Sequence, residues 1–179
     1  SDKLFIAANN FTGWHDIKLS VVHYGNVMGS RGSVVPFFLE RQKTGVLPIT
    51  DKHMTRFSIT LQQGVDFVLH CLDIMRGGEI FVPKIPSMRI MDLVAAVAPD
   101  CSVTFTGIRP GEKLHEVLVS EDEARHAAEL ADLYVIKPTH PWWSPEHWAD
   151  AARVQDGFRF TSDANTMWLS AAELKKLMA

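Results

Sequence analysis

The chain has 179 residues, 46% of them hydrophobic and 22% charged, which is the composition of an ordinary folded domain and excludes a disordered chain. Its net charge of −3 gives no reason to expect attraction to nucleic acid or to an anionic membrane. No apolar run reaches the ~20 residues that a membrane-spanning helix needs. Two cysteines, Cys71 and Cys101, stand in no metal or redox motif. We therefore expect a cytoplasmic protein that binds neither nucleic acid nor membranes.

Helical and extended patterns alternate along the chain. In chain order they predict a helix at 1–8, a strand at 17–27, a helix at 33–45, strands at 46–50 and 55–60, a helix at 60–76, a strand at 79–83, a helix at 89–98, a strand at 102–108, a helix at 120–131, a strand at 133–138 and a helix from 170. Such alternation indicates an α/β fold with mostly parallel strand pairing. The less regular stretch 139–166, rich in tryptophan, is expected to be a lid or an oligomer contact.

Three of these helices carry a capping-box signature, a Ser or Thr followed three residues later by Glu or Gln. The pairs are Thr60 with Gln63, Ser120 with Glu123, and Ser170 with Glu173. The helix after Thr60 also has apolar residues at helical spacing, which predict its buried face: Val65, Val68, Leu69, Leu72 and Met75. Four of the five tryptophans, Trp142, Trp143, Trp148 and Trp168, are expected to pack in the core or at an interface.

The sequence Arg109-Pro110-Gly111-Glu112 predicts a tight turn, because proline fixes its own φ and glycine tolerates a sharp reversal. Such a turn can aim the flanking cation and anion into one cleft. A guanidinium suits a diphosphate, and a carboxylate suits the diol of a sugar. The alternative is a surface turn with a weak local ion pair between Arg109 and Glu112.

Two further residues are candidate phosphate ligands. Arg56 lies between apolar neighbours, where an unpaired guanidinium is costly to bury, so an anionic partner is expected. That partner is either a ligand phosphate or an internal carboxylate. Asn26 lies at the carboxyl end of a predicted strand, where open α/β sheets bind ligands. It is either a phosphate contact or an ordinary turn residue.

Two other classes of site are excluded by spacing. Gly25, Gly29 and Gly32 are spaced differently from the glycines of a dinucleotide-binding loop, which need G-x-G-x-x-G before a long helix. The eight histidines show no metal-ligand spacing, so no metal site is expected.

Several stretches together go beyond spacing. Residues 1–10, 24–38, 48–69, 77–88 and 107–118 closely resemble the inverting UDP-N-acetylglucosamine 4,6-dehydratases, and "VPKIPSM" favours this family over related epimerases and capsule-type dehydratases. These are extended short-chain dehydrogenase/reductase (SDR) enzymes that begin pseudaminic acid biosynthesis. The resemblance implies the C-terminal part of an extended SDR Rossmann fold plus a small α/β substrate-binding domain.

The resemblance also implies a role for each matching residue. Arg56 and Arg109 would hold the UDP diphosphate, Glu112 the uridine ribose, and Asn26 the phosphates. Val34, Val35 and Pro36, with the backbone near Ile49, would line the uridine pocket. Tyr24 and Gly25 would lie near the nicotinamide of NADP. His23 replaces an arginine that usually precedes "YGN" in the family, so no charge-based role is expected at that position.

The implied chemistry needs a Tyr-x-x-x-Lys pair, an Asp–Lys pair and a glycine-rich cofactor loop, none of which is present in this sequence. In the family these lie upstream of the region that matches Ser1, so we expect no catalytic residue here and no activity from these residues alone. The expected organisation is 1–30 as the end of the NADP-binding domain, 31–138 as mainly the UDP-sugar-binding domain with some segments returning to the Rossmann sheet, and 139–179 as a tail or lid.

Two alternatives stay open. One is a UDP-sugar 4-epimerase or a retaining 4,6-dehydratase with the same fold, and the other is a non-catalytic UDP-sugar-binding module. The family resemblance further implies a homo-oligomer in the intact enzyme.

Overall fold

The structure is a computed structural model that describes residues 2–13, 15–30, 32–140, 143 and 145–178. The α-helices are α1 (Asp2–Ala8), α2 (Val34–Arg41), α3 (Leu61–Ile74), α4 (Ile90–Val97), α5 (Glu121–Ala124) and α6 (Ala171–Leu177). Short 3-10 helices follow at Asn9–Phe11, Gln42–Thr44 and Pro145–Trp148. Trp142, expected to be a packing residue, lies outside the described residues.

The chain forms two compact units, each assembled from three separate stretches of sequence. The first unit comprises Ser1–Tyr24, Val65–Lys84 and Leu118–Phe160, and the second comprises Gly25–Gly64, Ile85–Val117 and Thr161–Ala179. Strands β8 (Val117–Val119) and β12 (Phe160–Thr161) fall where the chain passes from one unit to the other. The assignment of cofactor binding to 1–30 and of UDP-sugar binding to 31–138 stays a prediction.

The first unit is built on a sheet with the strand order β1-β5-β10-β9-β11. Its strands are β1 (Val21–Val22), β5 (Ile80–Pro83), β9 (Ala127–Glu129), β10 (Leu133–Ile136) and β11 (Ala152–Arg153). Only β1 and β5 pair in parallel; β10 is antiparallel to both of its neighbours. A buried cluster made of Cys71, Phe81, Leu133, Val135, Trp143 and Trp148 packs in this unit, so two of the expected tryptophans are core residues.

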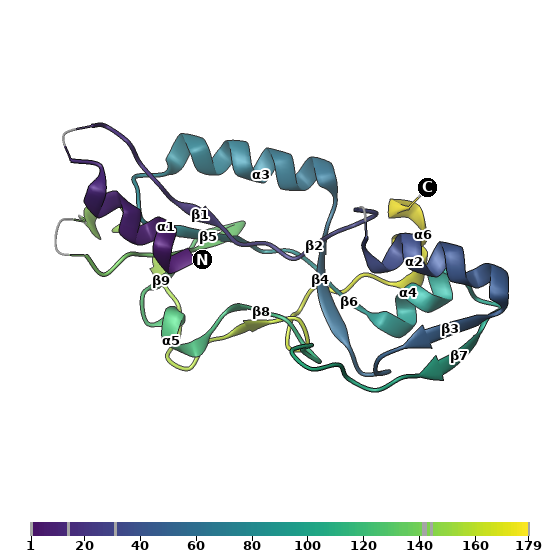
Figure 1. Cartoon of the computed structure of the whole chain (residues 1–179). Coiled ribbons are helices and arrows are strands. Elements are labelled where there is room, and N and C mark those ends of the chain that lie inside the picture. The colour runs from purple at the N-terminus through teal and green to yellow at the C-terminus, as the bar shows by residue number, and fades with distance from the viewer. Residues whose placement is uncertain (1, 14, 31, 141–142, 144, 179) are drawn as a thin grey trace. The chain divides into compact units, whose positions relative to one another are not determined.

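The second unit carries two small sheets and three helices. Strands β2 (Asn26–Val27), β4 (Thr55–Ile59) and β6 (Ser87–Arg89) form one sheet, and β3 (Val46–Ile49) pairs in parallel with β7 (Ser102–Phe105) in the other. Figure 1 shows α2, α4 and α6 gathered beside the β3–β7 pair. The shared core consists of Val35, Phe38, Leu47, Ile49, Met54, Met88, Ile90, Leu93, Val94, Ala98 and Leu174.

Three sequence-based expectations are wrong in detail. Pairing is mixed rather than mostly parallel, since β10 and β6 both run antiparallel to their partners. The helix expected at 120–131 ends at Ala124, because the buried Ala127 and Ala128 continue as β9 and pair with β10. The strand expected at 17–27 is instead two short strands, β1 and β2, which pair with β5 and β4 in different units.

The buried face of α3 also differs from the expected stripe. Val65, Leu69 and Leu72 are exposed by 45%, 55% and 59%. The helix instead turns Cys71 into the core, with Phe67 and Ile74 packed beside it, while Met75 packs against the same cluster as expected. An apolar stripe at helical spacing indicates that one face is apolar, but tertiary packing decides which residues meet the sheet.

Candidate functional site

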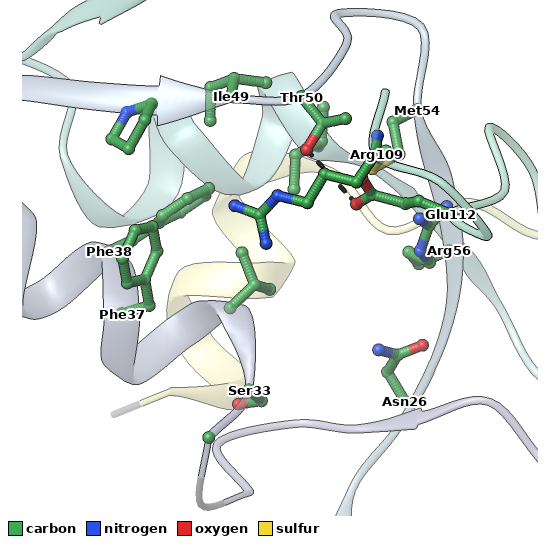
Figure 2. Close-up of a pocket in the computed structure, with 14 residues that line it drawn as sticks. Asn26, Ser33, Phe37, Phe38, Ile49, Thr50, Met54, Arg56, Arg109 and Glu112 are labelled. Atoms are coloured by element: carbon green, nitrogen blue, oxygen red, sulfur yellow. Dashed lines mark hydrogen bonds between the residues drawn. The ribbon is translucent and has the colours of Figure 1, made fainter. Parts of the chain in front are cut away.

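The candidate site is a cavity of about 410 Å³ in the second unit, at the place where the α2 N-terminus, β3 and the Arg109 turn meet. Figure 2 shows the side chains of Asn26, Arg56 and Glu112 on one side of it and the rings of Phe37 and Phe38 on the other. Its lining residues are Asn26, Gly32, Ser33, Val34, Phe37, Phe38, Pro48, Ile49, Thr50, Met54, Arg56, Ile90, Arg109 and Glu112. A mixed lining of this kind is typical of small-molecule sites.

The turn from Arg109 to Glu112 forms as its sequence predicts. The Glu112 N–H donates to the Arg109 carbonyl oxygen at 3.0 Å, and Gly111 adopts a φ of 80°, which side chains disfavour. Proline at the second position and glycine with positive φ at the third are typical of a type II turn. The turn therefore carries the Arg109 and Glu112 side chains at its two ends.

The Glu112 carboxylate is held from two sides. The Arg109 backbone N–H donates to one of its oxygens at 3.2 Å, and the Thr50 hydroxyl donates to the other at 3.3 Å. Each carboxylate oxygen can accept more than one hydrogen bond. Glu112 is thus oriented toward the cavity with acceptor capacity left for a ligand hydroxyl.

Like the Glu112 carboxylate, the Arg109 guanidinium forms no ion pair within the described residues. Within the part of the chain that the structure describes, it makes no ion pair or hydrogen bond with another side chain, and Figure 2 shows it pointing away from Glu112 into the cavity. The alternative of a local ion pair between the two ends of the turn is therefore not what the structure contains. A guanidinium in this position suits a planar, bidentate oxygen ligand such as phosphate.

The Arg56 guanidinium has protein partners. It donates to the carbonyl oxygens of Thr55, Lys113 and Leu114 at 2.7, 2.8 and 3.0 Å. Its Nε lies 3.9 Å from a carboxylate oxygen of Glu116, and only 15% of the side chain is exposed. The internal carboxylate expected as one of two possible partners for Arg56 is thus present, while Arg56 still borders the cavity.

The N-terminus of α2 adds hydrogen-bond donors to the lining of the cavity. Ser33 is the residue before the helix, and its side chain caps none of the backbone N–H groups of α2. Its hydroxyl is buried, with no hydrogen-bond partner among the described residues, and Ser33 and Val34 both line the cavity. Because the first N–H groups of a helix lack acceptors within it, they favour an anion at this end.

Most of the predicted ligand-contact residues meet in this one cavity. Asn26, Val34, Ile49, Arg56, Arg109 and Glu112 all line it. Val35 does not, because its side chain is buried in the core, and Pro36 is exposed on α2 outside the lining. The carbonyl oxygen of Ile49 already accepts the Thr106 N–H at 2.8 Å.

The two residues expected near NADP lie outside the cavity lining. Packing explains why residue 25 is a glycine, since a Cβ at this residue would lie 2.4 Å from the Phe57 Cβ and 2.8 Å from the Phe57 carbonyl oxygen. Tyr24 is half-buried and belongs to the other unit. These two residues do not by themselves form a site that would hold a dinucleotide, and their expected contact with NADP stays a prediction.

Sequence reasoning missed several residues of the cavity wall. Phe37 is 36% exposed and presents its ring to the cavity, and Thr50 holds Glu112. Phe37 follows Pro36 and lies three residues after Val34, so Val34 and Phe37 are on the same side of α2. The predicted helix and the expected ligand contact at Val34 together already indicated Phe37. Nothing local in the sequence indicated Thr50, because its partner is 62 residues away.

The described residues contain neither a metal-ligand cluster nor a helix that could cross a membrane. Among the described residues, no group of three or more His, Cys, Asp or Glu side chains could hold a metal ion. In the same part of the chain, no helix is both long and apolar enough to cross a membrane.

Comparisons with known proteins define the class. The polysaccharide biosynthesis protein family matches residues 1–138, and the chain belongs to this family. Two relatives from Campylobacter jejuni, each named UDP-N-acetylglucosamine 4,6-dehydratase (inverting), are 46% identical over 187 residues (serotype O:2) and 49% over 183 residues (serotype O:23/36). These alignments cover 99% and 97% of this chain but 56% and 55% of the relatives.

Two further matches extend the picture. A UDP-glucose 4-epimerase of Rickettsia canadensis is 40% identical over 140 residues, covering 75% of this chain and 41% of the relative. The solved structure of Pen from Bacillus thuringiensis superposes with a TM-score of 0.83 at 32% identity, covering 99% of this chain and 54% of that one. The predicted Rossmann-type α/β fold is confirmed. The chain spans about half the length of the curated relatives it matches.

Proposed function

We propose that this chain carries the UDP-sugar-binding part of a UDP-N-acetylglucosamine 4,6-dehydratase that inverts C5 and supplies a 4-keto-6-deoxy sugar nucleotide for pseudaminic acid or a similar surface glycan. The observation that supports this most is the Arg109 guanidinium, which forms no ion pair with any described residue and faces the same cavity as the oriented Glu112 carboxylate. The relatives named for this activity support the proposed substrate class, and the family match is consistent with it.

In this proposal the ligand lies with its charged part toward Arg109 and the N-terminus of α2. The diphosphate oxygens accept hydrogen bonds from the Arg109 guanidinium, the Asn26 amide and the backbone N–H groups at the start of α2. Glu112 accepts hydrogen bonds from the ribose hydroxyls. The exposed ring of Phe37 and the apolar wall at Pro48 cover the uracil.

The reaction itself is assigned to the whole protein. There, a nicotinamide cofactor, NADP in this proposal, would take up a hydride from the sugar and return it, and the groups that move protons are expected outside these residues. The cavity residues bind and orient the sugar nucleotide. By the same family resemblance we expect the whole protein to be cytoplasmic and homo-oligomeric, and this chain alone to be inactive.

A second candidate is a 4-epimerase that acts on a UDP-hexose. The Rickettsia relatives named UDP-glucose 4-epimerase favour it, with 40% identity over three quarters of this chain. Both candidates use the same UDP clamp. Incubating the whole protein with UDP-N-acetylglucosamine and UDP-glucose separates them, because a dehydratase forms a 4-keto product while an epimerase changes only the configuration at C4.

The proposal is tested by titrating UDP-N-acetylglucosamine into this chain by calorimetry. We expect saturable binding that Arg109→Ala weakens by about 10- to 100-fold, since a charge-assisted hydrogen bond contributes ~1.5–3 kcal/mol. Arg125→Ala is the matched control, because Arg125 is an exposed arginine of the first unit that pairs only weakly with Asp122. A folded chain that shows no binding, or equal affinity for the Arg109→Ala protein, would refute the proposal.

A further inference from the structure

The segment 113–116 follows the Arg109 turn directly and is fastened to β4 mainly through side chains. From β4, Arg56 donates to the carbonyl oxygens of Lys113 and Leu114. In the opposite direction, a carboxylate oxygen of Glu116 accepts the Phe57 N–H of β4 at 2.8 Å. Arg56 and Glu116 thus each reach across to the backbone of the other's segment, and we call this reciprocal pair the β4 clasp.

Charge strengthens the β4 clasp. The Arg56 Nε lies 3.9 Å from Glu116 Oε1, and the two side chains are only 15% and 26% exposed. Hydrogen bonds that involve an ionised group are stronger than neutral ones, and partial burial reduces their screening by water. Removing one member leaves the other as a partly buried charge without its neighbour.

Other contacts hold the same segment independently of the β4 clasp. His115 Nδ1 lies 2.8 Å from the Thr55 hydroxyl, which lies 2.7 Å from the Ser162 hydroxyl. The Glu116 N–H donates to the Ser162 hydroxyl oxygen at 2.9 Å. A variant that lacks the Glu116 carboxylate therefore retains an anchored segment, and we expect it to fold.

The turn itself has few restraints of its own. Arg109 is exposed, and the side-chain bonds that hold the turn are those from Thr50 and from the Arg109 N–H to Glu112, at 3.3 and 3.2 Å. The position of the turn thus depends on the chain on either side of it, which is held upstream by the Thr106 N–H bond to the Ile49 carbonyl oxygen at 2.8 Å and downstream by the contacts of residues 113–116. A turn that is already fixed before binding loses less conformational entropy when it contacts a ligand.

We propose that Glu116 and Arg56 are positioning residues for nucleotide binding, which fix residues 113–116 and thereby the turn that presents Arg109 and Glu112. Glu116 does not line the cavity, so it acts through the turn and not by contact with the ligand. Arg56 combines this positioning role with its place on the cavity wall. The inference rests on the proposed function, since it concerns the same binding site.

A double-mutant cycle tests the positioning role, with UDP as the titrant and this 179-residue chain as the protein. The four proteins are wild type, Glu116→Ala, Arg109→Ala and the double variant. We expect Glu116→Ala to weaken UDP binding by about tenfold in the wild-type background and by less than about threefold in the Arg109→Ala background, because coupled residues are not additive. Equal factors in the two backgrounds, or an unchanged affinity of Glu116→Ala, would overturn the inference.

Hydrogen exchange of the ligand-free proteins gives a second readout that does not depend on binding. Amides in 107–113 are expected to exchange about tenfold faster in Glu116→Ala, while those of β3 and α4 keep the wild-type rate. Glu116→Gln keeps an oxygen for the Phe57 N–H and loses the charge beside Arg56, so an intermediate rate is expected. It also replaces the alanine variant if that does not fold. Unchanged exchange in the turn would refute the positioning role.

The outcomes for the two proposals are distinct. Wild-type protein that fails to bind UDP refutes the proposed function, and with it this inference. Wild-type protein that binds UDP through Arg109, combined with additive effects of Glu116→Ala, refutes only the positioning role. Glu121→Ala serves as the control in both experiments, because Glu121 is an exposed carboxylate at the start of α5 that does not line the cavity.

Discussion

Replacing Glu79 tests how far the first unit depends on one buried carboxylate. Glu79 directly precedes β5 and is fully buried. One of its oxygens accepts the Arg76 N–H at 2.9 Å and lies 3.4 Å from the Trp148 Nε1. The other accepts the Ser20 hydroxyl at 2.7 Å and the Gly77 N–H at 2.8 Å. The carboxylate thus joins the end of α3, the start of β1 and the segment that contains Trp148.

The expected loss follows from these bonds. A hydrogen bond to a charged group contributes ~1.5–3 kcal/mol, but neighbouring bonds are not additive and burying the charge is itself costly. Glu79→Ala leaves buried donors without an acceptor and opens a void, so we expect it to lower the free energy of unfolding by about 3–5 kcal/mol. Glu79→Gln keeps the volume, yet either orientation of its amide places an NH₂ group against an N–H donor. We expect a loss of about 2–3 kcal/mol for it.

Urea unfolding, followed by far-ultraviolet circular dichroism and tryptophan fluorescence, measures both losses. Glu173→Gln is the matched control, because Glu173 is a carboxylate of the exposed capping box of α6. Its replacement should cost about 1 kcal/mol or less. If the free energy of unfolding of Glu79→Gln lies within about 0.5 kcal/mol of the wild-type value, the donors around Glu79 do not depend on its charge and the reasoning is refuted.

Further predictions concern single residues. Gly25→Ala should lower the free energy of unfolding by about 1–3 kcal/mol, and with it the melting temperature, because the added Cβ would lie 2.4 Å from that of Phe57. An unchanged melting temperature would show that packing does not require this glycine. Phe37→Ala should weaken the binding of UDP and of uridine by the same factor of about ten and leave the chain folded with a somewhat lower melting temperature, whereas an effect on UDP alone would contradict a base contact. Burial raises the pKa of the Cys71 thiol from 9.0 to about 12, with a smaller contribution from the negative charge of Asp132. A thiol reagent at pH 8 should therefore label the half-buried Cys101 in the folded chain and leave Cys71 unlabelled until urea is added, and equal labelling would refute this.

The same shift has a consequence for stability at high pH. The folded chain keeps the Cys71 proton up to about pH 12, while the unfolded chain loses it near 9.0. The contribution of the buried thiol is therefore fully present below pH 9.0 and is lost as the pH rises through about 12. Cys71→Ala should flatten the decline of stability between these two values, which a urea titration at several pH values measures.

The sequence by itself determined features that depend on a few consecutive residues. The capping boxes at Ser120 and Ser170 form with both hydrogen bonds that their sequences predict, and those helices begin where expected. The Arg109 turn likewise forms locally, because proline fixes its own φ and glycine permits the positive φ of the third position. Family resemblance added the proposed class of ligand, which agrees with the names of the relatives in the comparisons.

Other features depended on partners far along the chain. The sequence after Ala124 has helical propensity, but its strand pairing with β10 stabilises β9 instead. The apolar residues of α3 gave no sign of which of them the sheet would cover. Local propensity is weak compared with the burial of apolar surface, so the tertiary structure decides such cases.

The site shows the same division. The sequence indicated that Arg109 and Glu112 act from one turn, and that Arg56 needs an anionic neighbour. Only the tertiary structure determined that Glu116 lies beside Arg56, since the two are brought together from separate segments of the second unit. A guanidinium binds whichever oxygens surround it, and those neighbours exist only after the chain has folded.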